Sequence, residues 1–184
     1  MLRNAIEIWL AFAAAILITG LYALVVLFTR GIPAASDWFG HGLGIIGFLL
    51  MLMTEILYSL RKRMRTVHFG RMSLWLKFHI FTGLVGPYMV LLHTSWKFNG
   101  LAGVTTLLTV VIVISGFVGR YIYTRIPRTA EGVVIEGSSS AEALKHARRL
   151  MALWHTIHIP IGMALFIAAF VHIGAALYYA TFLN

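Results

Sequence analysis

Residues 79–83 read H-I-F-T-G, and the pattern returns as H-I-P-I-G at residues 158–162. In each copy a second histidine follows the first by fourteen residues, giving the pairs His79 and His93, and His158 and His172. An α-helix turns by about 100° and rises about 1.5 Å per residue, so this spacing brings the second histidine to within roughly 40° of the first, about 21 Å along the axis. Each stretch therefore predicts a helix with two imidazoles on one face.

The composition is that of an integral membrane protein. Of the 184 residues, 60% are hydrophobic and only 11% are charged, whereas soluble domains carry about 25% charged residues. The mean hydropathy is +0.87. The formal charge of +9 comes from basic residues that gather in particular loops. That distribution indicates membrane topology and argues against nucleic-acid binding.

Five apolar segments are long enough to cross a bilayer, which takes about 20 residues. They cover approximately residues 5–29, 38–60, 74–96, 101–123 and 150–182. Helices are the expected form because an open strand edge leaves backbone groups unsatisfied in lipid. The first segment is too long for the core of a signal peptide, so it is predicted to be retained. We expect an all-α integral membrane protein in which residues 1–184 form one domain, a bundle of five transmembrane helices.

Basic residues predict the orientation of these segments. Two loops are rich in Lys and Arg, at residues 61–71 and 120–149, whereas the opposite side of the membrane has only Arg30 and Lys97. By the positive-inside rule the basic loops and the N-terminus are cytoplasmic, and the C-terminus is external. The second loop, about residues 124–140, leads into S-S-A-E at residues 139–142, which resembles a helix-capping box. A bacterial cytoplasmic membrane is the expected location.

The two histidine-bearing segments are both odd-numbered, so they are predicted to run in parallel from inside to outside. Ionisable residues within a membrane are costly and face the bundle interior. An imidazole that binds heme iron through one nitrogen and donates a hydrogen bond from the other avoids most of that cost. We therefore expect two stacked hemes, the inner one held by His79 and His158 and the outer one by His93 and His172.

The absence of cysteine restricts the chemistry further. It excludes disulfides, cysteine-ligated iron–sulfur clusters, zinc ribbons and covalent heme attachment. The expected cofactors are therefore two non-covalently held hemes b, and bis-histidine ligation leaves no open iron position, which suits electron transfer. An alternative is that the four histidines are unrelated polar residues that hydrogen-bond between helices. The repeated spacing and flanking pattern favour ligation.

Glycines accompany the histidines on the same helix face. Gly83 and Gly162 each follow the first histidine of their copy by four residues, and Gly86 follows His79 by seven. Residues four apart are neighbours on a helix surface, so these glycines are predicted to let a flat porphyrin lie against the backbone. The alternative is that they are small-residue contacts between helices, which are common in membranes.

Other polar residues are candidates for supporting the hemes. His155 lies one turn before His158 but about 100° off the face of His172, so we interpret it as a propionate partner or a snorkelling interface residue, with ligation as the alternative. Heme propionates attract cations. The candidates are Lys77, Arg120, Arg148 and Arg149 near the inner heme, and Lys97 near the outer one. For each cation, contact with lipid head groups is the alternative.

The remaining polar residues are interpreted as supporting the fold or its surface. His41 is expected at the outer interface, with contact to the outer heme or to a quinone head group as the alternative. His68 and His146 are expected to be solvated in the basic segments. Glu7 and Glu55 are expected to form snorkelling ion pairs, with proton relay as the alternative.

At the four histidines the chain resembles the ferric reductase-like transmembrane domain family, which includes NADPH oxidases, ferric reductases and membrane subunits of bacterial sulfoxide reductase systems. The family's shared feature is two histidine pairs, on its third and fifth helices, that hold two hemes b across the bilayer. The resemblance covers roughly residues 38–180. Two features depart from it: the family usually has six helices where five are predicted here, and its oxidase members carry a flavin–nicotinamide domain that this chain lacks.

The predicted function is transmembrane electron transfer, with the chain as the membrane subunit of a larger redox complex. Redox proteins on the cytoplasmic side, the outer side or both are the expected partners, with a quinone as a further candidate and the bilayer as the surroundings. One alternative is a stand-alone ferric or quinone reductase. Another is a non-redox membrane protein whose histidines bind a metal, but carboxylates are scarce within the apolar segments. No catalytic residues are predicted.

Overall fold

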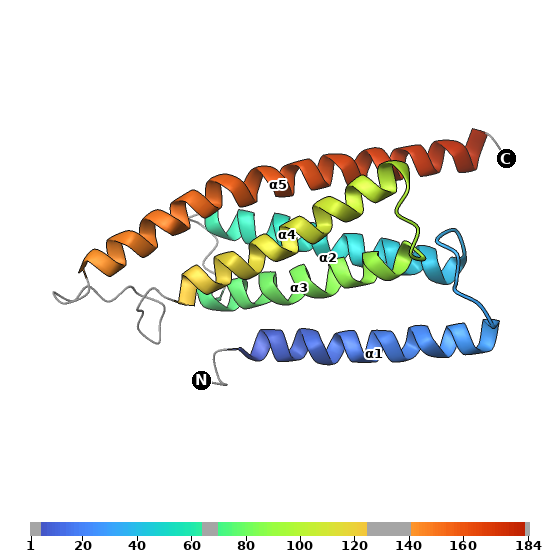
Figure 1. The fold of residues 1–184 in the computed structure, drawn as a ribbon, viewed down its shortest axis with the longest axis horizontal. Coiled ribbons are helices and arrows are strands. Elements are labelled where there is room, and N and C mark those ends of the chain that lie inside the picture. The colour runs from blue at the N-terminus through green and yellow to red at the C-terminus, as the bar shows by residue number, and fades with distance from the viewer. Residues whose placement is uncertain (1–4, 64–69, 125–140, 183–184) are drawn as a thin grey trace. The chain divides into compact units, whose positions relative to one another are not determined.

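The computed structural model describes residues 5–63, 70–124 and 141–182. These residues form five helices and no strand (Figure 1). The helices are α1 (Ile6–Thr29), α2 (Trp38–Arg63), α3 (Met72–His93), α4 (Gly100–Thr124) and α5 (Ala141–Phe182). All five are long and apolar enough to cross a membrane. The predicted all-helical architecture, with five helices long enough to span a membrane, is therefore confirmed. The helix boundaries match the predicted apolar segments to within a few residues, except that α5 begins before its apolar segment.

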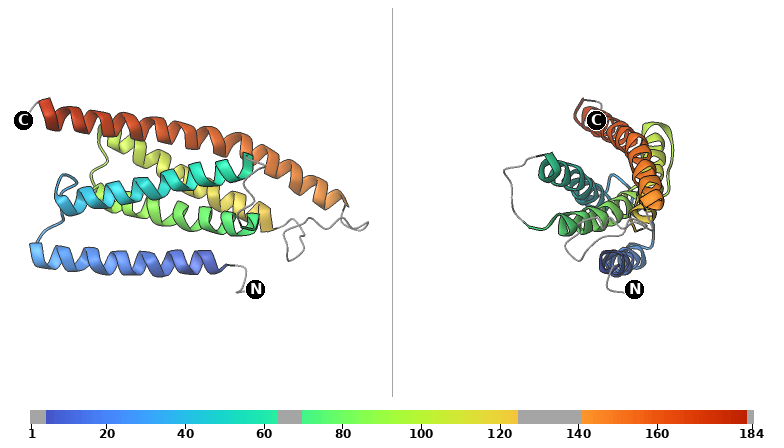
Figure 2. Two further views of the ribbon diagram at one scale, coloured as in Figure 1. Left: turned by 180° about the vertical axis from the view of Figure 1, so that it is seen from behind. Right: turned by 90° about the vertical axis from the view of Figure 1, so that its left-hand side faces the viewer.

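The chain divides into two compact units, Met1–Lys97 and Phe98–Asn184. In the first unit α2 and α3 pack along each other in opposite directions, and α1 lies against α3 (Figure 2). The core of this unit consists of Ala11, Leu43, Val85, Met89 and Leu92. Each of the three helices contributes apolar side chains to this core. The core therefore holds α3, which carries His79 and His93, against its two neighbours.

Two glycines bring α2 and α3 close together. A Cβ atom at Gly86 would lie 2.8 Å from the carbonyl oxygen of Gly47 and 2.9 Å from Cγ of Met51. In turn, a Cβ atom at Gly47 would lie 2.8 Å from the carbonyl oxygen of Gly86. Small residues permit such backbone contact between membrane helices, where dispersion and weak polar contacts replace the hydrophobic effect. Gly86 therefore has a packing role, which is the alternative considered above for the glycines near His79.

The second unit is a hairpin of α4 and α5. At 42 residues, α5 is about 63 Å long, roughly twice the thickness of a hydrocarbon core of about 30 Å. It begins at Ala141, within the capping box predicted at residues 139–142, and continues through the apolar segment predicted at residues 150–182; residues 139 and 140 lie outside the described residues. Its first turns are amphipathic, because Leu144 and Ala147 are buried while Lys145 and Arg149 are exposed. An amphipathic start of this kind is typical of a helix that continues beyond the bilayer.

Both histidine-bearing helices contain a proline between their two histidines, Pro87 in α3 and Pro160 in α5. Proline has no N–H group, so the carbonyl four residues earlier loses its helical donor. Those carbonyls belong to Gly83 and Thr156. Such sites are tolerated within membranes where neighbouring groups satisfy the carbonyl, and they are common positions of helix kinks.

Lipid is the natural surroundings of the exposed side chains. On α1, Leu17 is 75% exposed, Leu27 73% and Phe28 85%. Large apolar side chains exposed along a whole helix would be costly in water, whereas they match hydrocarbon tails. The five exposed apolar helices are compatible with the predicted integral membrane protein.

Candidate heme-ligand histidines

His93 is held by the backbone of α2. Its Nδ1 atom lies 2.8 Å from the carbonyl oxygen of Gly40, in the first turn of α2. The imidazole lies directly against Gly44, because a Cβ atom there would be 2.8 Å from Nδ1 and 2.9 Å from Cγ of the ring. A carbonyl oxygen accepts and cannot donate, so in a neutral imidazole this contact favours the tautomer with the proton on Nδ1. This is the tautomer of a histidine that binds a metal through Nε2.

His79 also contacts a backbone carbonyl of α2, toward the opposite end of the α2–α3 pair. Its Nδ1 atom lies 3.3 Å from the carbonyl oxygen of Thr54 in α2, and its ring centroid is 4.9 Å from that of Tyr58. The hydroxyls of Thr54 and Thr82 are 2.6 Å apart, and both residues are buried. Thr82 donates to the carbonyl of Phe78 at 2.8 Å, so it accepts from Thr54. This polar link fixes α2 against α3 beside the imidazole.

In the second unit, α4 contacts His158. The Nδ1 atom of His158 lies 2.9 Å from Oγ of Ser115. The neighbouring indole of Trp154 stacks on the imidazole, with centroids 4.4 Å apart and an interplanar angle of 28°. The indole Nε1–H donates to the backbone carbonyl of Ser115 at 2.7 Å. The preceding helix of each hairpin therefore supplies a hydrogen-bond partner to His79, His93 and His158.

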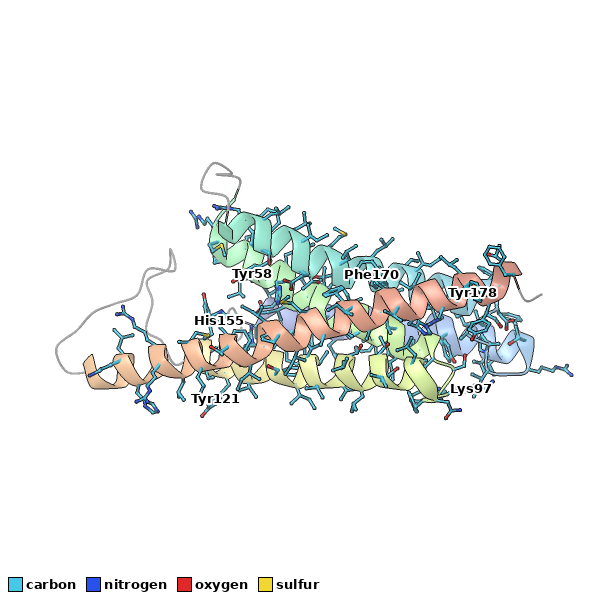
Figure 3. The ribbon with its side chains drawn as sticks, turned by 90° about the horizontal axis from the view of Figure 1, so that it is seen from above. Tyr58, Lys97, Tyr121, His155, Phe170 and Tyr178 are labelled. Atoms are coloured by element: carbon cyan, nitrogen blue, oxygen red, sulfur yellow. The ribbon has the colours of Figure 1, made fainter. Side chains whose placement is uncertain are left out.

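His155 differs in its partner. Its Nδ1 atom lies 2.9 Å from the carbonyl oxygen of Met151, four residues earlier on α5 itself. Its ring lies 4.8 Å from the Trp154 ring, tilted by 60°. Figure 3 labels this residue on α5, and Tyr58 on α2. A bond within one helix fixes the ring to its own backbone, whereas the bonds of His79, His93 and His158 tie two helices together.

His172 lies fourteen residues beyond His158 on α5 and is half-buried. None of the described residues forms a hydrogen bond with its ring. The orientation of this imidazole is therefore not set by a hydrogen bond from the described chain, in contrast to His79, His93 and His158.

The three glycines predicted to clear a porphyrin have different surroundings. A Cβ atom at Gly83 would meet only Cγ2 of Thr54, at 3.6 Å, and one at Gly162 only Cδ1 of Ile112, at 3.9 Å. Both are ordinary van der Waals contacts, so helix packing does not require glycine at either position. Gly86 is explained by its contact with Gly47, as described above. That Gly83 and Gly162 let a porphyrin lie against the helix backbone stays a prediction.

The predicted cations lie at the ends of the helices. Lys97 follows α3 and is exposed, Arg148 and Arg149 are exposed on the first turns of α5, and Lys77 and Arg120 are half-buried. The hydrogen bonds described above for His79, His93 and His158 involve backbone carbonyls and Ser115. A role in binding propionates stays a prediction for each of them.

Other polar residues are placed as follows. His41 is exposed at the start of α2, and its ring is edge-on to that of His93, with centroids 6.4 Å apart. Glu7 is buried at 3% exposure, whereas Glu55 is exposed and accepts from Oγ of Ser59 at 3.2 Å. His146 is exposed, as predicted, and His68 lies outside the described residues.

Comparison with known proteins adds no assignment. No protein-family model, curated protein or solved structure matches this chain. Among the described residues, no group of three or more His, Cys, Asp or Glu side chains forms a metal-binding cluster, although axial ligation of a heme requires only two histidines. The likeness to the ferric reductase-like family therefore rests on the four histidines and their spacing.

Sequence analysis missed the residues that orient the histidines. Gly40, Gly44, Thr54, Ser115 and Trp154 were not predicted as part of the site. A signal existed for two of them, because residues 40–44 read G-H-G-L-G, and glycines four apart mark a face where another backbone or ring approaches closely. For Ser115 and Trp154 the sequence offers no comparable signal.

Proposed function

We propose that this protein transfers electrons across a membrane through two hemes b. His79 and His158 hold the iron on the cytoplasmic side, and His93 and His172 hold the iron on the outer side. The observation that carries the proposal is the pair of carbonyl contacts on α3, Gly40 O to His93 and Thr54 O to His79. In neutral rings both contacts favour the tautomer with the proton on Nδ1, in which Nε2 is the atom that would bind a metal, on two histidines fourteen residues apart on one helix.

The donor set fits an axial heme ligand. A heme iron would be bound through Nε2, and the hydrogen bond from Nδ1–H to a carbonyl would hold the ring plane and increase the basicity of the ligand. His158 fits in the same way when its Nδ1–H donates to Ser115.

The chain's own residues have distinct tasks in this proposal. The four histidines would hold the two hemes, and bis-histidine ligation would leave no open iron position for water or oxygen. When bound, the hemes supply reversible one-electron chemistry. The offset of about 21 Å between the histidines of one helix covers most of a hydrocarbon core of about 30 Å. Two hemes held at these two levels would let electrons cross between the two sides without a mobile carrier in the membrane interior.

The proposed setting is a bacterial cytoplasmic membrane, with this chain as the membrane subunit of a redox complex of the ferric reductase-like kind. The exposed cations Lys145, Arg148 and Arg149 favour a redox protein with an acidic surface on the cytoplasmic side. A second redox protein or a quinone exchanges electrons with the outer heme. A stand-alone reductase of ferric ion or quinone is the second candidate, favoured by the exposed His41 beside His93.

Heme content tests the proposal directly. The full-length protein, purified from heme-replete cells, is expected to contain about two hemes per chain, with a six-coordinate low-spin b-type spectrum. Because no cysteine is present to attach them, acidic acetone is expected to extract both. The measurement is a pyridine hemochrome assay against protein concentration. A folded, colourless preparation would contradict the proposed function.

A topology experiment tests the parallel arrangement of α3 and α5. A reporter fused after Asn184 is expected to be external, and one inserted at Ser139 cytoplasmic, because the basic loops stay inside. Alkaline phosphatase and green fluorescent protein fusions report opposite sides. If both positions were on one side, α5 would not cross the membrane, and the proposed pairing of its histidines with those of α3 would fail.

A further inference from the structure

The most specific arrangement in the second unit surrounds His158. Ser115 and Gly119 lie four residues apart on α4, and Trp154 and His158 lie four residues apart on α5, so each pair shares one helix face. These four residues contact one another in a closed set of hydrogen bonds and ring contacts. We infer that Ser115 and Trp154 are positioning residues that fix the His158 ring for iron and set the potential of the inner heme. This inference rests on the proposed function.

The indole of Trp154 restricts the imidazole sterically. It covers one face of the His158 ring at 4.4 Å between centroids and lies nearly parallel to it. Gly119 is buried and makes room for the indole, since a Cβ atom there would overlap Cε2 and Cζ2 of Trp154. The Trp154 indole therefore packs directly against α4, and it blocks rotation of the His158 imidazole toward it.

Hydrogen bonds restrict the same two rings. Trp154 Nε1–H donates to the Ser115 carbonyl at 2.7 Å and also lies 3.2 Å from Ser115 Oγ. The same Oγ atom lies 2.9 Å from Nδ1 of His158. With iron on Nε2, the proton of the neutral ring belongs to Nδ1, which then donates to Ser115 Oγ. The serine thus links the orientation of the imidazole to that of the indole.

The partner of His158 is a side chain, whereas those of His79 and His93 are backbone carbonyls. The His158 hydrogen bond can therefore be removed by substitution without altering the backbone. Donation from Nδ1–H increases the basicity of the imidazole, and a more basic ligand stabilises ferric over ferrous iron. Loss of the Ser115 hydroxyl is therefore expected to raise the midpoint potential of the inner heme and leave the outer one unchanged.

The test compares full-length Ser115→Ala, Ser115→Thr and Trp154→Phe proteins with the wild type. Ser115→Ala is expected to retain two hemes, with an upward shift of one midpoint potential and altered g-values of one low-spin heme. Ser115→Thr retains an Oγ atom and is expected to restore the wild-type values. Trp154→Phe keeps an aromatic ring but loses the N–H donor, and is expected to broaden the same g-values by loosening the ring.

Thr156→Ala is the matched control, because Thr156 is exposed on α5 and donates to its own helix at the Ala152 carbonyl. It is expected to leave both potentials unchanged. Two unchanged potentials in Ser115→Ala, with two hemes bound, would overturn the inference and leave the proposed function intact. If Ser115→Ala fails to fold, the Trp154→Phe and Ser115→Thr spectra decide: wild-type g-values in Trp154→Phe would overturn it. A wild type without heme would overturn both proposals.

Discussion

His158→Ala is expected to remove one of the two hemes, whereas His155→Ala is expected to retain both. The two residues lie one turn apart on α5, and their hydrogen bonds differ. His158 is held from α4 through Ser115, while His155 is bound to the Met151 carbonyl of its own helix. The offset of fourteen residues places His158 within about 40° of the face of His172, whereas that of seventeen places His155 about 100° away.

The measurement is heme per chain, combined with a redox titration of each variant. His158→Ala is expected to halve the heme content. In the redox titration, one of the two midpoint potentials is expected to disappear and the other to stay unchanged. His155→Ala serves as the matched control, with at most a shift of one potential through lost hydrogen bonding. If His155→Ala lost a heme while His158→Ala retained two, the ligand of the inner iron would be His155.

Gly44→Ala is expected to disrupt the outer heme selectively. The new Cβ atom would lie 2.8 Å from Nδ1 of His93 and 2.9 Å from Cγ, so the ring must move away from α2 and weaken its bond to the Gly40 carbonyl. Overpacking of this kind typically costs about 1–3 kcal/mol, which corresponds to a loss of affinity of roughly 5-fold to 150-fold. The readout is the affinity of the apoprotein for the second equivalent of heme.

Gly42→Ala is the matched control, two residues away on the same helix. A Cβ atom at Gly42 meets nothing within 4 Å, so this variant is expected to bind both hemes as the wild type does. The inner heme is expected to be retained in both variants, because His79 contacts α2 at Thr54, far along the helix. Equal outer-heme affinity in Gly42→Ala and Gly44→Ala would show that the imidazole does not depend on its contact with α2.

The glycines illustrate how far sequence reasoning extends into the candidate site. The spacing of Gly83 and Gly86 places both on the helix face of His79, so the sequence predicted the same role for both. The structure separates them, because Gly86 is required by the approach of Gly47 while Gly83 has room for a Cβ atom. Periodicity reports which face of a helix a residue occupies. It does not report the distance to the neighbouring helix, which depends on side chains far away in the sequence.

The sequence by itself determined the five long apolar helices and the spacing of the paired histidines, because both are local properties. A bilayer requires about 20 apolar residues per span and internal satisfaction of backbone hydrogen bonds, so hydropathy alone places α1 to α5. Helical periodicity likewise places two imidazoles on one face. Only the tertiary structure decided which groups orient those imidazoles: Gly40 and Thr54 on α2, and Ser115 on α4. Such contacts form between separate helices and depend on the crossing of their backbones, which no single segment encodes.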